Sequence, residues 1–156
     1  MPFPPFRRQA FHAITMTALC ALAGCDVPLG VRRTATLSQL PSRAAIEMAL
    51  HAVPEIERVE YHQVPAATSG SIYEPAVYDP AYDQFAYWGN GAGGVVEVRE
   101  TGKGVKTLNL YEINFTGFTK EQIDHIRTLM DKVYASLRIY APGIPPETQV
   151  HEIVSP

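Results

Sequence analysis

The sequence predicts an α+β fold, a two-layer sandwich in which a small antiparallel sheet carries two amphipathic helices on one face. Two segments, 42–53 and 119–137, repeat apolar residues at helical spacing. Three further segments, 56–64, 95–100 and 105–113, read as half-buried strands. The expected order along the chain is therefore helix, strand, long loop, two strands and helix.

The first helix is expected to begin at Pro41 or Ser42, because proline suits the first helical position and serine suits the cap. Pro54 ends it, since proline cannot continue a helix. Its apolar face consists of residues at helical spacing, namely Ile46, Ala49, Leu50 and Val53. The strand over 56–64 follows, because apolar and polar residues alternate there.

Residues 72–88 are expected to form an aromatic loop. Proline after an acidic residue keeps the backbone extended and interrupts a regular ladder, and this happens twice in the segment. A long irregular segment inside a small domain usually has a function. Tyrosine and tryptophan offer large contact areas with a polar handle, so the candidate partner-binding residues are Tyr73, Tyr78, Tyr82, Tyr87 and Trp88. The alternative is that these rings fold back and cover the sheet.

The last third of the chain is regular again. An antiparallel hairpin is expected over 95–113, with its turn at 101–104. Thr119 and Gln122 have the spacing of a capping box, which opens the second helix. Its buried arc is predicted to contain Ile123, Ile126, Leu129, Met130, Val133, Tyr134 and Leu137. A short edge strand is expected over 150–154.

The N-terminus has the pattern of a targeting segment. Two arginines precede an apolar run over 13–23, which is far shorter than the ~20 residues that span a bilayer. The run ends in Leu22-Ala23-Gly24-Cys25. This resembles the signal peptide and lipobox of bacterial lipoproteins, in which a leucine and small residues precede the lipidated cysteine. An ordinary cleaved secretory signal is the alternative.

The resemblance covers residues 1–25 only. It implies a signal peptide over 1–24, cleavage before Cys25, a lipidated tether over 25–36 and one periplasmic domain over 37–156. Cys25 is then the lipidation site, and the covalent lipid is the only expected cofactor. Two or more acyl chains hold a protein firmly on a membrane. The protein is expected to face the periplasm from the cell membrane or the outer membrane.

Composition narrows the functions further. Without residues 1–24 the chain keeps 132 residues, enough for one domain, and has a net charge of about −5, which argues against nucleic acid as a partner. Cys20 leaves with the signal peptide and Cys25 carries lipid. No thiol then remains for catalysis, a disulfide or a metal. The remaining histidines lack the close spacing of metal ligands, so no metal site is expected.

Two functions from different classes fit these observations. The first is a membrane-anchored, non-catalytic binding or assembly module that engages an envelope protein or the cell-wall glycan through residues 72–88. The second is a small cell-envelope hydrolase whose pair of catalytic carboxylates would come from the loop acids Glu74, Asp79 and Asp83. The sequence has no Gly-x-Ser-x-Gly nucleophile elbow, so the binding module is favoured.

Overall fold

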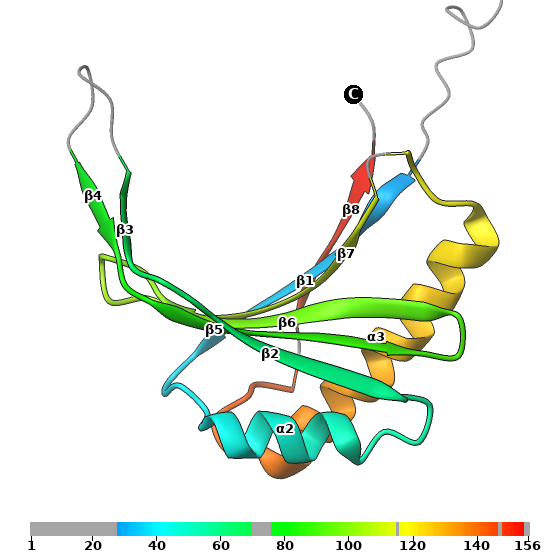
Figure 1. Cartoon of the computed structure of the whole chain (residues 1–156), viewed down its shortest axis with the longest axis horizontal. Coiled ribbons are helices and arrows are strands. Elements are labelled where there is room, and N and C mark those ends of the chain that lie inside the picture. Colours follow the sequence, from blue (N-terminus) through cyan, green and yellow to red (C-terminus); the bar gives the residue numbers. More distant parts are fainter. Residues whose placement is uncertain (1–27, 70–75, 115, 147, 155–156) are drawn as a thin grey trace, which may run out of the picture.

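An open antiparallel sheet of six strands, in the order β2-β5-β6-β7-β1-β8, forms the framework of the protein (Figure 1). The computed structural model describes residues 28–69, 76–114, 116–146 and 148–154. The predicted α+β class is confirmed. The strands of the large sheet are β1 (Pro28–Leu37), β2 (Arg58–Val64), β5 (Tyr82–Gly89), β6 (Ala92–Glu100), β7 (Lys106–Ile113) and β8 (Gln149–Val154). A separate two-stranded ribbon joins β3 (Ala67–Ser69) to β4 (Val77–Asp79), and the helices are α2 (Arg43–His51) and α3 (Lys120–Tyr140).

β1 lies inside the sheet, paired with β7 on one side and with β8 on the other. The sequence predicted residues 28–36 as part of a tether and the domain as starting at 37, and this prediction is wrong. Val31 is fully buried in the core. The strand pattern was hidden because Arg33 takes an inward position, where an apolar residue is expected. Its guanidinium forms an ion pair with Asp131 of α3.

The prediction of an aromatic loop over 72–88 is also wrong for the part of this segment that the structure describes. β4 and β5 take up most of the described part of residues 72–88, and β5 pairs with both β2 and β6. Pro80 falls between β4 and β5, so it separates two strands and does not prevent them from forming. The segment 70–75, which includes Tyr73 and Glu74, lies outside the described residues.

The helices and the hairpin follow the prediction closely. Ser42 caps α2, its hydroxyl accepting a hydrogen bond from the Ala45 amide. Thr119 and Gln122 complete the predicted capping box of α3. All seven residues predicted for the inner arc of α3 are buried. β8 forms the expected edge strand beside β1. Among the described residues, neither helix is long and apolar enough to cross a bilayer.

The core lies between the sheet and the helices. Alternate residues of the inner strands point toward the helices, and the fully buried ones are Val31, Phe85, Tyr87, Val96, Leu108 and Leu110. α3 packs on β6 and β1, and α2 packs on α3. The Ser136 hydroxyl of α3 donates to the Ala49 carbonyl of α2 at 2.7 Å, which satisfies both groups between the helices.

The intervening residues of each strand point to the opposite side of the sheet, which we call the open face. Strand alternation and register assign to it Arg32, Thr34, Arg58, Glu60, His62, Tyr82, Gln84, Trp88, Glu97, Arg99, Asn109 and Tyr111. The sheet is bent, so that the β3–β4 ribbon and the side formed by β1, β7 and β8 both rise away from the helices (Figure 1). The open face is therefore concave.

Candidate functional site

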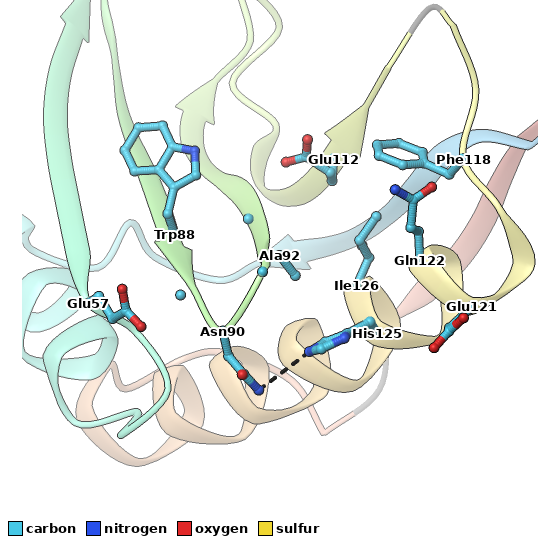
Figure 2. Close-up of a pocket in the computed structure, with 13 residues that line it drawn as sticks. Glu57, Trp88, Asn90, Ala92, Glu112, Phe118, Glu121, Gln122, His125 and Ile126 are labelled. Carbon is cyan, nitrogen blue, oxygen red and sulfur yellow. Dashed lines mark hydrogen bonds between the residues drawn. The ribbon is translucent and has the colours of Figure 1, made fainter.

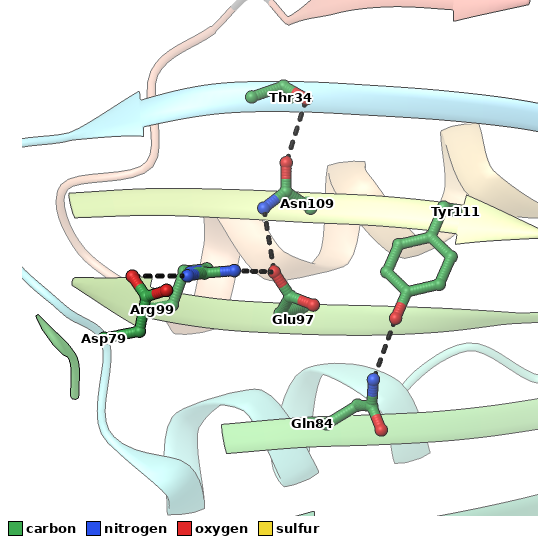
Figure 3. Close-up of polar contacts among 7 residues, drawn as sticks. All are labelled: Thr34, Asp79, Gln84, Glu97, Arg99, Asn109 and Tyr111. Atoms are coloured by element: carbon green, nitrogen blue, oxygen red, sulfur yellow. Dashed lines mark hydrogen bonds and ion pairs between the residues drawn. The ribbon is translucent and has the colours of Figure 1, made fainter. Parts of the chain in front are cut away.

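A chain of polar side chains crosses the open face (Figure 3). The Thr34 hydroxyl donates to Asn109 Oδ1 at 2.9 Å, and Asn109 Nδ2 donates to Glu97 Oε1 at 3.2 Å. Arg99 lies between two carboxylates, with Nη1 3.8 Å from Glu97 Oε1 and Nη2 3.1 Å from Asp79 Oδ1. The chain therefore links four strands, β1, β7, β6 and β4.

Glu97 is the centre of this network. It is only 9 % exposed although it lies on the face away from the helices. A carboxylate this buried is costly unless it is paired and hydrogen-bonded, and Asn109 and Arg99 supply both contacts. Arg99 Nε is itself buried and has no hydrogen-bond partner in the described part of the chain. The network is thus built into the fold, with one buried donor still unused.

Arginine and aromatic side chains are paired along the same face. In each pair the guanidinium carbon lies 5.0–5.5 Å from the centre of a ring, and the pairs are Arg32 with Tyr111, Arg58 with Trp88 and Arg99 with Tyr82. Cation–π contacts of this kind hold planar groups in fixed positions. The open face therefore presents ordered rings and guanidinium groups together.

Tyr111 occupies the middle of the sheet. Its hydroxyl accepts a hydrogen bond from Gln84 Nε2 at 2.8 Å, which connects β7 to β5 across β6 (Figure 3). Burial, and then the nearby Glu97 carboxylate, raise the pKa of the Tyr111 hydroxyl above its ordinary value. The hydroxyl therefore stays neutral and remains both a donor and an acceptor at physiological pH.

The residues predicted to bind a partner are only partly brought together. Tyr78 of β4 is 59 % exposed and Trp88 of β5 is 40 % exposed, whereas Tyr82 is half-buried beside Arg99. The prediction that Tyr87 binds a partner is wrong, because Tyr87 points toward the helices and is fully buried in the core. Tyr73 and Cys25 both lie outside the described residues.

Tyr87 fills the space above a glycine of the next strand. A Cβ atom added to Gly94 would lie 2.4 Å from the Tyr87 hydroxyl oxygen, so only glycine leaves room for the ring. The hydroxyl has no hydrogen-bond partner among the described residues. Burial raises the pKa of Tyr87 strongly, and the charge of Glu112 adds to the effect.

The loop carboxylates considered for a hydrolase point to different faces. Asp79 Oδ1 contacts Arg99 on the open face. Asp83 Oδ1 accepts a hydrogen bond from the Tyr61 hydroxyl at 2.9 Å, on the side that faces the helices. Two catalytic carboxylates have to flank one bond of the substrate. Asp79 and Asp83 do not have this arrangement.

A pocket of about 490 Å³ lies between the β5–β6 turn and the first half of α3 (Figure 2). Among the described residues, its lining includes three carboxylates, Glu57, Glu112 and Glu121, and no lysine or arginine. Asn90 Nδ2 and His125 Nε2 approach to 3.5 Å at its edge. Burial raises the pKa of Glu112, so this carboxylate carries its charge at a cost.

Sequence reasoning missed the polar network on the open face. A signal for it was present, because Glu97 and Arg99 alternate with two buried valines. Asn109 and Tyr111 alternate with two buried leucines in the same way. The period of two places these four residues on one face. Their mutual contacts depend on strand order, which the alternation does not give.

No group of three or more metal-ligating side chains occurs within the described ranges. Comparison of the chain with protein-family models, with curated proteins and with solved structures found no match.

Proposed function

We propose that this protein is a lipid-anchored bacterial envelope protein that works as a non-catalytic binding or assembly module, and that it binds its partner on the open face of the sheet. The observation that carries the proposal is that exposed Trp88 lies on the same face of the sheet as the buried Glu97 network. Ordered aromatic and arginine side chains are the residue types that dominate recognition surfaces.

We infer a fold of two layers, with both helices on the same face of the sheet. This arrangement leaves the concave face to a partner. Its three arginine–aromatic pairs hold their rings in place before binding, which lowers the entropy lost when a partner arrives. An envelope protein and a cell-wall glycan both suit such a surface, because aromatic rings pack on apolar side chains and on sugar rings.

Site-specific photo-crosslinking in cells tests the binding face. A probe at Trp88 is expected to give a discrete adduct, whereas a probe at Tyr140 is not. The control is matched, because Tyr140 lies at the end of α3 and is also 40 % exposed. Equal adducts from both positions, or an adduct from Tyr140 alone, would contradict the proposal.

Substitutions separate binding from catalysis. Trp88→Ala together with Tyr82→Ala is expected to abolish adduct formation at a neighbouring open-face probe, because both rings are lost from that face. Asp83→Asn keeps an acceptor for the Tyr61 hydroxyl and is expected to leave binding unchanged. The hydrolase alternative predicts the opposite pattern, with loss of turnover in Asp83→Asn.

The two cysteines test the lipid anchor. Cys25→Ala is expected to abolish incorporation of labelled palmitate, while Cys20→Ala is expected to leave it intact, because only Cys25 ends the lipobox. The two cysteines are five positions apart and serve as each other's controls. Labelling that persists in Cys25→Ala would rule out the lipoprotein assignment and leave the binding face to be tested separately.

A further inference from the structure

β2 forms one edge of the six-stranded sheet. It pairs with β5 along one side only, and no other strand lies beside it in the part of the chain that the structure describes. Four of its seven residues, Arg58, Glu60, His62 and Gln63, are exposed. An unpaired edge offers a row of backbone donors and acceptors to a further strand. Its side chains decide which strand fits.

We propose that β2 pairs with β2 of a second copy of this chain, antiparallel, about a two-fold axis at Tyr61. In this register Arg58 lies opposite Val64 of the other copy, Val59 opposite Gln63, and Tyr61 opposite itself. All seven residues of the strand are paired. The two sheets then join into one continuous sheet. The proposed dimer does not depend on the proposed function.

Charge complementarity selects this register. Glu60 lies opposite His62 of the second copy, and the axis repeats the contact, so that two acid–histidine pairs form on the open face. In the structure the His62 side chain is exposed and has no hydrogen bond to any other described residue. Pairing therefore gives His62 a contact that the single chain lacks.

The neighbouring registers are unfavourable. A shift of two positions places Glu60 against Glu60 in one direction and His62 against His62 in the other, and like residues directly opposite repel when charged. A shift of one position puts residues of the open face opposite residues that face the helices. A register with Arg58 opposite Glu60 pairs only the first three residues of β2. In the single chain, moreover, Arg58 already contacts Glu60 and Trp88.

The pairing has a consequence for the shape of the assembly. A two-fold axis perpendicular to the sheet keeps the open faces of both copies on the same side, and the helices of both copies on the other. The concave surface described above would thus be doubled, with the junction at β2 between its halves.

Charge reversal tests the register on the full chain, purified from membranes in detergent and analysed by light scattering across a concentration series. The wild type is expected to dimerise. Glu60→Lys and His62→Glu are each expected to raise the dissociation constant by about tenfold, from two mismatched pairs of up to about 1 kcal/mol each. The double variant is expected to recover affinity, because opposite charges again face each other across the axis.

The matched control is Glu121→Lys with His125→Glu, an acid and a histidine that are both exposed on α3. Neither single control is expected to change the dissociation constant. A wild-type chain that stays monomeric throughout the series overturns the proposal. A dimer that tolerates the single β2 variants, or that the double variant fails to restore, also overturns it.

Cysteine cross-linking tests the axis itself. Residues directly opposite on antiparallel strands have Cα atoms about 4.5–5.5 Å apart, which suits a disulfide. Tyr61→Cys is expected to give a covalent dimer under mild oxidation, whereas the wild type and Lys103→Cys, in an exposed turn, are not. If Tyr61→Cys does not fold, a mixture of Glu60→Cys and His62→Cys chains is expected to cross-link instead. Cross-linking that is strongest at Lys103→Cys, or absent from both β2 tests, overturns the proposed axis.

Discussion

The guanidinium of Arg99 lies 3.1 Å from the carboxylate of Asp79, and this contact ties the end of β4, in the β3–β4 ribbon, to β6 of the main sheet. The same side chain reaches Glu97 and stacks on the Tyr82 ring. One residue of β6 therefore positions an exposed ribbon, a buried carboxylate and an aromatic ring. The shape of the candidate binding face depends on it.

Arg99→Met is expected to lower the free energy of unfolding by about 1–3 kcal/mol, because Glu97 loses its ion pair while it remains buried. Amide hydrogen exchange over β4 should also become faster. Lys106→Met is the control, since Lys106 is 4.0 Å from Glu100 in a more exposed pair and should cost less than about 1 kcal/mol. If urea unfolding shows that the two variants lose equal amounts of unfolding free energy, the Glu97 network does not stabilise the fold.

Tyr87→Phe is expected to leave stability unchanged or to raise it by about 1 kcal/mol. The substitution removes a buried hydroxyl that has no partner in the described structure. Tyr61→Phe is the contrasting variant and should destabilise by about 1 kcal/mol, because it removes the hydrogen bond to Asp83. Denaturant unfolding measures both. A large loss in Tyr87→Phe would mean that the hydroxyl has a partner after all.

Gly94→Ala is expected to destabilise the protein by about 1–3 kcal/mol, since the added Cβ would lie 2.4 Å from the Tyr87 hydroxyl oxygen. Tyr87→Leu shortens the side chain and should recover part of this loss in the double variant. A double-mutant cycle, followed by thermal unfolding, measures the coupling between the two positions. Additive effects would show that the ring and the glycine are not in contact.

Glu112→Gln is expected to stabilise the protein increasingly as the pH rises. Burial raises the pKa of Glu112 above its ordinary value of 4.5, so the folded state binds this proton more tightly than the unfolded state. The contribution to stability is present below pH 4.5 and is lost as the pH rises through the folded-state pKa. The melting temperature of the variant should therefore exceed that of the wild type by a growing margin as the pH rises above 4.5. A constant difference would contradict a buried, ionising Glu112.

Local patterns were sufficient for the elements whose side chains keep one period. The inner arc of α3 could be predicted residue by residue, because its apolar residues recur at helical spacing over the whole helix. The capping residues Ser42 and Thr119 were equally readable, since a cap requires only a short polar side chain at the right position.

β1 and β5 could not be predicted, for physical reasons that differ. In β1, Arg33 is inward and depends on Asp131 of α3, a partner that is nearly a hundred residues away and therefore invisible to local patterns. In β5, the aromatic residues divide between the two faces, so Trp88 is exposed while Tyr87 is buried. A count of aromatic residues alone suggested one surface. The contacts among side chains of the open face depend on strand order, which local patterns do not give either.

If the protein is lipid-anchored, the position of β1 limits how far the domain can move from the membrane. If lipid is attached at Cys25, only Asp26 and Val27 separate the anchor from the first residue of an internal strand. Three steps along the backbone reach at most about 11 Å. A linker this short would keep the domain beside the lipid headgroups with a restricted range of orientations. A partner of the open face would therefore have to come to the membrane surface.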